Sequence, residues 1–271
     1  MSDQRESRAW GEDQVLEKWH EIGPLIDVLA QRADTPGEWR AAPGSSLAGD
    51  DRASAPYQVS HAVHQCLLAA IDHAHAVKRL VFDHQELHTS APGSLSRGFI
   101  ENAATAYWIL HPSGRAERVA RTLKWHVKNA NDRSTALSNV PEIPPPRRPV
   151  GEQIQSMLDV ARRARIEDQE YVRRGYRPSQ PVEYADVHAG VLGVGVLFSW
   201  QICSGFAHGR PWASMGVLER EELPTADPGV VDMRLSNDFT RTLFPVLTGM
   251  HLMEAVLKLH RARSTATFTS R

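Results

Sequence analysis

Apolar residues recur at helical spacing through most of this 271-residue chain. In the first periodic segment, residues 13–32, one face is formed by Val15, Trp19, Ile22, Ile26 and Leu29. In the second, residues 58–87, the same kind of face is formed by Val59, Val63, Cys66, Leu67, Ala70, Ala74, Val77 and Val81. No run alternates between apolar and polar positions for long enough to indicate a sheet. We therefore predict an all-α fold, a single helical bundle of six or seven helices.

Capping residues, glycines and prolines set the expected ends of these helices. Ser94 is a suitable N-cap for the third helix, and Ser236 or Asn237 for the last one. Segments 35–56 and 209–229 are rich in glycine, proline and acidic residues, which predicts loops. The predicted helices occupy residues 13–32, 58–87, 94–110, a stretch that begins at 115, then 152–174, 184–208 and a last stretch that ends near 261.

The segment 140–150 reads VPEIPPPRRPV and contains five prolines. Proline lacks the backbone donor that a helix needs, and its ring clashes with the preceding turn. We expect a stiff, proline-rich connector between two helices. Accordingly, we predict one bundle domain over residues 13–262, with a disordered N-terminus at residues 1–12 and a disordered C-terminus at residues 263–271.

The charge of the chain is balanced overall but unevenly distributed. Lys and Arg number 31 and Asp and Glu 32, so the net charge of −1 indicates neither a nucleic-acid nor a membrane partner. Residues 115–177, however, hold 14 basic and 8 acidic side chains, a net charge of +6. This distribution predicts one basic face, and we assign Arg162, Arg163 and Arg165 on it to the binding of a polyanion.

Cysteine usage and hydropathy favour a cytoplasmic protein. Cys66 and Cys203 are the only cysteines and form no CxxC motif, so neither a disulfide framework nor a structural zinc site is indicated. The first 14 residues are polar and lack the apolar core of a secretory signal. Residues 189–207 carry no formal charge over 19 positions, but their glycines and Gln201 favour the central helix of a bundle over a membrane span. We expect no membrane partner.

The second predicted helix carries a histidine-rich face opposite its apolar stripe. This face is formed by His61, His64, Asp72, His75 and Arg79. Imidazole and carboxylate ligands suit zinc, iron or nickel, so a metal-dependent helical-bundle enzyme is one alternative. Ligands inside a bundle should point inward with the apolar stripe, however. We therefore predict a solvated face, with no metal and no cofactor.

Three polar residues stand in apolar surroundings and form the candidate catalytic site. Arg97 and Glu101 are one turn apart in the third predicted helix, and His208 follows the uncharged 189–207 segment. Because few polar groups accompany them, we expect these side chains to meet in space and to form either a catalytic site or a structural clamp. Cys203 is also close enough in sequence to His208 to suggest a cysteine nucleophile.

Arginine precedes histidine with four residues between them in two places, Arg79 to His84 and Arg121 to His126. This is the spacing found in the HEPN ribonucleases, where both side chains face RNA from one helix. We therefore add Arg121 and His126 to the candidate polyanion-binding residues. His208 has no arginine at this spacing before it.

The strings RGFIENAATAYWILHP, RAERVAR and SGFAHGRPW begin at residues 97, 115 and 204. With them the chain resembles a group of uncharacterised actinobacterial helical proteins and, distantly, the HEPN-like and abortive-infection-like families. The resemblance spans about residues 70–212 and implies a helical bundle that binds RNA or another polyanion. It further implies a ribonuclease or a degenerate relative of one, acting in defence or in a stress response.

The sequence leaves other functions open. A non-catalytic ligand-binding or regulatory interaction module could use the groove beside His208, and the metal-dependent enzyme described above is the third candidate. Whether the protein is an enzyme is not decided by its motifs, because GxSxG, Walker and HExxH patterns are all missing from the sequence. We also expect a homodimer formed through an apolar helical face.

Overall fold

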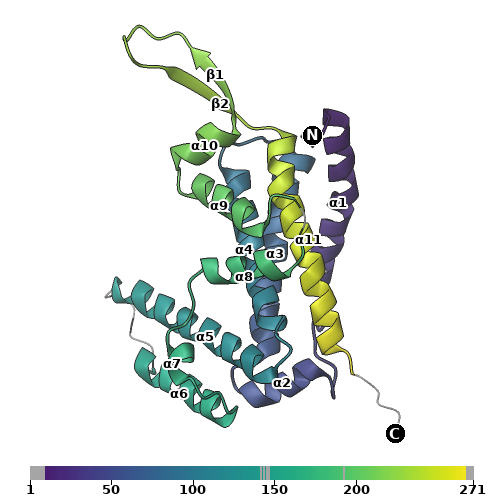
Figure 1. Ribbon diagram of the computed structural model, residues 1–271, viewed down its shortest axis with the longest axis vertical. Coiled ribbons are helices and arrows are strands. Elements are labelled where there is room, and N and C mark those ends of the chain that lie inside the picture. The colour runs from purple at the N-terminus through teal and green to yellow at the C-terminus, as the bar shows by residue number, and fades with distance from the viewer. Residues whose placement is uncertain (1–9, 141, 143, 145–146, 192, 267–271) are drawn as a thin grey trace, which may run out of the picture.

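The computed structural model describes residues 10–140, 142, 144, 147–191 and 193–266, and these are predominantly helical (Figure 1). The helices within these ranges are α1 (Glu12–Ala33), α2 (Ser46–Ser54), α3 (Val59–Lys78), a π-helical turn η1 (Arg79–Asp83), α4 (Ala91–Leu110), α5 (Arg115–Ser138), α6 (Val150–Arg163), α7 (Gln169–Arg173), α8 (Ser179–His188), α9 (Val196–Ala207), α10 (Pro211–Val217) and α11 (Phe239–Ser264). Strands β1 (Glu219–Leu223) and β2 (Asp232–Ser236) form a small antiparallel hairpin. The all-α class is confirmed, but the eleven α-helices in the described ranges exceed the six or seven predicted.

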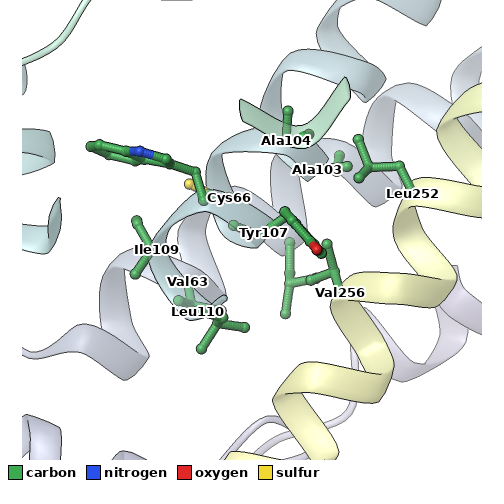
Figure 2. Close-up of a cluster of buried hydrophobic side chains, with 14 of the residues drawn as sticks. Val63, Cys66, Ala103, Ala104, Tyr107, Ile109, Leu110, Leu252 and Val256 are labelled. Carbon is green, nitrogen blue, oxygen red and sulfur yellow. The ribbon is translucent and has the colours of Figure 1, made fainter. Parts of the chain in front are cut away.

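Helix α4 is the centre of the fold. It contacts α3, α11, α9, α8 and α5, and every residue from Ala103 to Leu110 is buried. Figure 2 shows this core, in which Cys66 of α3, Tyr107 of α4 and Val256 of α11 converge. Burying such apolar side chains is the main favourable contribution to folding.

Glycines let the neighbouring helices approach α4 closely. A Cβ atom at Gly98 would lie 2.3 Å from the His73 ring of α3, and one at Gly249 would lie 2.4 Å from the Phe99 ring of α4. Larger residues at either position would push a helix away from the core. Gly98 belongs to the first of the three strings that carry the family resemblance.

The predicted apolar stripes are buried. All five stripe residues of α1 and all eight of the second predicted helix lie in the core. In α5, Val119, Leu123 and Val127 point inward. The periodic spacing of apolar residues therefore identifies the correct buried faces, because the same faces must be covered in any packing of these helices.

Two segments predicted as single helices are each divided in two. The segment 152–174 is α6 and α7, separated where Arg165 adopts a φ of 58°. The segment 184–208 is α8 and α9, separated by a loop in which Gly190, Gly193 and Gly195 all have positive φ. Residues 189–207 therefore do not form one continuous helix, and the glycines make a left-handed connection that other residues rarely adopt.

The two predicted loops contain regular structure. Helix α2 lies within 35–56, where the Ser45 side chain accepts a hydrogen bond from the Ala48 N–H. Helix α10 and strand β1 lie within 209–229. The sequence does not predict the hairpin because EREEL has one apolar residue and DMRLS alternates over only five positions.

Several helix ends differ from the predicted ones. Helix α4 begins at Ala91, ahead of Ser94, and α3 passes into the π-helical turn after Lys78. The N-cap of α11 is Asp238, whose carboxylate accepts from the Arg241 N–H, in place of Ser236 or Asn237. These shifts of a few residues are typical of helix ends, where several polar side chains can cap.

The proline-rich connector and both termini stay predictions. Residues 141, 143, 145 and 146 of the connector, residues 1–9 and residues 267–271 lie outside the described ranges.

Of the described helices, only α11 is long and apolar enough to cross a membrane, a test that the core helix of a soluble bundle also passes. Here α11 packs against α1, α2, α4 and α9.

Candidate functional site

Arg97 and Glu101 form an ion pair on α4, beside Trp200 of α9. Arg97 Nη2 lies 3.4 Å from Glu101 Oε2, and the Trp200 Nε1–H donates to the same oxygen at 3.0 Å. The Arg97 guanidinium carbon lies 5.7 Å from the centre of the Trp200 ring, within cation–π range. The two ionic side chains are 28% and 29% exposed, so the pair sits at the edge of the α4–α9 contact rather than in the core.

One atom of this cluster has no partner. Arg97 Nε is buried and makes no hydrogen bond to the described part of the chain. A buried donor without an acceptor is costly in a folded protein, so it is a position where a bound acceptor would be favourable. Cys203 lies nearby, but burial raises the pKa of its thiol to about 12, against the opposing effect of Arg97. It is therefore a neutral thiol and a poor nucleophile.

His208 lies at the C-terminal end of α9 and is exposed. Trp200, Ser204 and His208 are spaced four residues apart and share one line of the helix. Together with residues of α10 they border an open cavity of about 330 Å³, which we call the Trp200 groove. Its lining residues are Trp200, Gln201, Ser204, Gly205, His208, Arg210 and Trp212.

The predicted catalytic residues are thus joined only indirectly. No hydrogen bond or ion pair connects His208 to Arg97 or Glu101 in the described ranges. Trp200 contacts the ion pair and also lines the groove that holds His208. The catalytic role assigned to the three residues stays a prediction.

The Trp212 ring is held at the groove by close helix packing. A Cβ atom at Gly205 would lie 2.5 Å from Ala213 Cβ and 2.9 Å from the Trp212 ring. Trp212 is nevertheless 56% exposed, so much of the residue is open to solvent. An exposed aromatic ring beside a cationic side chain, here Arg210, is a suitable platform for stacking a planar group.

The second part of the site is an arginine-rich surface on α5, α6 and α7. Across residues 115–177, ten arginines and six carboxylates are exposed, an excess of four positive charges on the surface. Arg162, Arg163 and Arg165 are among the exposed ten. The excess is smaller than the net charge of +6 because four basic residues but only two carboxylates are buried or partly buried. These are Arg118, Arg121, Lys124 and Lys128, and Glu117 and Asp159.

Arg121 and His126 do not lie on this surface. The Arg121 Nε–H donates to Glu117 at 2.7 Å and its Nη1–H to the Trp108 carbonyl at 2.7 Å. Burial lowers the pKa of His126 to about 4, with a further lowering from His61, so its imidazole is neutral. Both side chains face protein groups, because the inner face of α5 carries polar as well as apolar residues.

The histidine-rich face of α3 is spread along the helix. His61, Asp72 and Arg79 are exposed, whereas His64 and His75 are partly buried. Within the described ranges, no three histidine, cysteine or carboxylate side chains gather closely enough to hold a metal ion. His75 lies instead 3.6 Å from Asp27 of α1.

A cluster of tyrosines and histidines between α4 and α8 is not among the predicted site residues. The Tyr107 hydroxyl donates to the His188 carbonyl at 2.7 Å, and His111 Nδ1 lies 2.8 Å from the Tyr184 hydroxyl. Burial, aided by the charges of His188, Arg121 and Arg263, lowers the pKa of His111. The two pairs, Tyr107 with His111 and Tyr184 with His188, are each four residues apart, which is the signal that could have revealed them.

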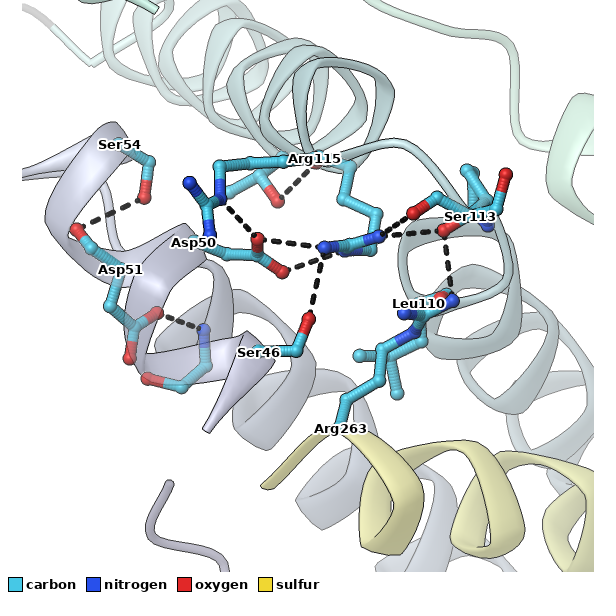
Figure 3. Close-up of polar contacts among 12 residues, drawn as sticks. Ser46, Asp50, Asp51, Ser54, Leu110, Ser113, Arg115 and Arg263 are labelled. Carbon is cyan, nitrogen blue, oxygen red and sulfur yellow. Dashed lines mark hydrogen bonds and ion pairs between the residues drawn. The ribbon is translucent and has the colours of Figure 1, made fainter. Parts of the chain in front are cut away.

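A buried ion pair between α2 and α5 was also missed (Figure 3). Arg118 Nε–H donates to Asp50 Oδ2 at 2.6 Å and Nη2–H to Oδ1 at 2.8 Å, and both residues are almost fully buried. Arg118 also donates to the carbonyls of Pro112 and Ser113, and Arg263 donates to those of Leu110 and Pro112. These contacts satisfy the end of α4, so the cluster is structural.

Comparison of the chain with protein-family models, curated proteins and solved structures finds no match. The function must therefore be inferred from the geometry of the site.

Proposed function

We propose that this protein is a cytoplasmic, HEPN-like protein that binds single-stranded RNA. The observation that carries the proposal is the Trp200 groove, in which an exposed indole, Arg210 and His208 surround one open cavity. Proteins that bind single strands combine aromatic stacking platforms with a basic surface that follows the backbone.

The arrangement of the helices supports a joint role for the two parts of the site. Helices α9 and α10 and helices α5 to α7 lie on the same side of the central helices, opposite α1 (Figure 1). A strand whose base stacks on Trp212 would bring its phosphates toward Arg210. The exposed arginines of α5 to α7 would contact phosphates farther along the strand.

The geometry favours binding over cleavage. Of the two arginine–histidine pairs with the HEPN spacing, Arg121 and His126 are buried and partly buried, while Arg79 and His84 are exposed. Neither pair lines the Trp200 groove, where His208 is the one histidine among the described lining residues. His208 has no carboxylate within ion-pair distance in the described ranges to orient it as a general base. We therefore place the protein with the degenerate, non-cleaving relatives of the ribonucleases.

The experiment is fluorescence polarisation of a labelled oligouridylate at increasing salt concentrations. We expect the affinity to fall as salt rises, and the triple variant Arg162→Gln, Arg163→Gln, Arg165→Gln to lower the salt slope by about 2, since each phosphate contact contributes about 0.7. The matched control is Arg220→Gln with Arg234→Gln on the hairpin, which should leave the slope unchanged. Binding with the same slope in the triple variant would contradict the role of these arginines.

The same RNA, labelled at one end and incubated with the wild-type protein, tests for cleavage. The proposal expects intact RNA on a denaturing gel. Shortened products that disappear with His208→Ala would show a ribonuclease and contradict the assignment to a non-cleaving relative.

A further inference from the structure

A second cavity lies on the opposite face of α9 from the Trp200 groove. It has a volume of about 270 Å³ and is bounded by α9, the first turns of α11 and the start of α4. Ile202, Cys203 and Phe206 of α9 form one wall, and Pro92 and Gly93 of α4 contribute to another. We call it the α9–α11 cavity.

The lining of this cavity is mostly apolar but contains a few hydroxyl groups. Ser199 is buried, and its hydroxyl donates to the Gly195 carbonyl at 2.9 Å and lies 3.0 Å from the Thr248 hydroxyl. Thr240 contributes a further hydroxyl from the first turn of α11. Such a lining, apolar with a small number of placed polar groups, is typical of a small-molecule site.

The charge at the cavity is already compensated. Arg241 is the one charged side chain among the described residues that line it. It is ion-paired with Asp238, lies 3.9 Å from Glu219, and its Nε–H donates to the Val217 carbonyl at 2.7 Å. An anionic ligand would have to compete with these partners, so the cavity favours an uncharged molecule.

Three large apolar side chains from different elements are exposed around the opening. Val194 of the α8–α9 loop is 59% exposed, Phe198 of α9 is 48% exposed and Phe244 of α11 is 44% exposed. All three line the cavity. Exposed apolar side chains that converge on a concave site are costly in water, and a bound apolar molecule would cover them.

We propose that the α9–α11 cavity binds a small, uncharged and largely apolar molecule that carries one hydroxyl or carbonyl group. An apolar cavity of about 150 Å³ is known to accept benzene, so this one, at about 270 Å³, is large enough for a two-ring aromatic molecule. The Thr240 hydroxyl can donate to or accept from the single polar group, and the Ser199 hydroxyl, whose hydrogen goes to Gly195, can accept from it. The site is separate from the proposed RNA site, because it uses the other face of α9.

The test is isothermal titration calorimetry of the full chain with 2-naphthol. We expect a saturable isotherm with one site, and about tenfold or greater loss of affinity in Ile202→Trp, whose indole would fill the cavity. Thr240→Phe, which narrows the cavity from α11, is the second variant and should give the same loss. The matched control is Gln201→Trp, which adds the same ring to the opposite face of α9.

The proposal is overturned by any of three results. These are no saturable binding of 2-naphthol to the wild-type protein, unchanged binding in both cavity variants, or loss of binding in Gln201→Trp alone. Naphthalene-2-sulfonate binding as tightly as 2-naphthol would contradict the uncharged class of ligand. Circular dichroism shows whether each variant folds. If Ile202→Trp or Thr240→Phe fails to fold, the affinity of the other cavity variant for 2-naphthol tests the proposal.

Discussion

The indole N–H of Trp200 donates to the carboxylate of Glu101 across 99 residues of sequence, and this bond joins α9 to the central helix. It also fixes one wall of the Trp200 groove, since Trp200 lines that groove. Arg97, paired with the same carboxylate, completes the contact. This hydrogen bond is therefore one of the contacts that position the groove relative to α4.

Replacing Trp200 by Phe keeps most of the ring but removes the donor. We expect the free energy of unfolding to fall by about 1 to 2 kcal/mol, because hydrogen bonds to charged groups are stronger than average but this one is partly exposed. Glu101→Gln should cost less, about 1 kcal/mol, since an amide oxygen still accepts. Urea denaturation measures both, and a loss of more than about 3 kcal/mol in Glu101→Gln would indicate a buried charge instead.

The Asp50–Arg118 pair should behave differently because it is buried. We expect Asp50→Asn to lower the free energy of unfolding by about 3 to 5 kcal/mol, the usual consequence of leaving a buried charge without its partner. The matched control is Asp132→Asn, which breaks an exposed ion pair with Lys128 and should cost less than about 0.5 kcal/mol. Similar losses of unfolding free energy in the two variants would show that the buried Asp50–Arg118 ion pair does not stabilise the fold.

The stability should also depend on pH through His126. Its pKa is about 4 in the folded protein and near 6.5 when unfolded, so between these values the unfolded chain binds the proton first and stability falls as the pH falls. The loss should reach up to about 3 kcal/mol at pH 4. His126→Gln should flatten this part of the stability profile. If His126→Gln leaves the pH dependence of the unfolding free energy unchanged, protonation of His126 is not what lowers stability at acidic pH.

The predicted homodimer would use the groove between α1 and α11. Leu25 and Val28 of α1 are 55% and 50% exposed and line this groove, whose volume is about 620 Å³. We expect the wild-type protein to sediment as a dimer and the Leu25→Glu, Val28→Glu variant as a monomer. Val187→Glu, on the exposed side of α8, is the control. A wild-type monomer at all concentrations would contradict the prediction.

Local patterns predicted the buried faces but not the breaks between helices. The apolar stripe of α1 and that of α3 are visible in the sequence because burial repeats with the helical period. The loop between α8 and α9 could not be located in advance, because Gly190, Gly193 and Gly195 also suit close packing within a helix. Their backbone conformation depends on how α8 and α9 both pack against α4.

The candidate site was predicted only in part, because its contacts join distant segments. Arg97 and Glu101 are one turn apart, so their pairing follows from helix geometry. The role of Trp200 and Trp212 depends on how α9 and α10 pack, which no local pattern reveals. Asp50 is buried in a stretch that looks like a loop, and only Arg118, 68 residues away, explains why a carboxylate is there.

The most direct test of the proposed function compares two exposed tryptophans in RNA binding. Trp212 lines the Trp200 groove. Trp10 does not line that groove and packs instead against Phe244 of α11. With a labelled oligouridylate in fluorescence polarisation, Trp212→Ala should weaken binding roughly 5- to 150-fold, the equivalent of about 1 to 3 kcal/mol for one stacked base. Trp10→Ala should bind as the wild type does. Equal affinity in the two variants, or no binding by the wild type at low salt, would contradict the account.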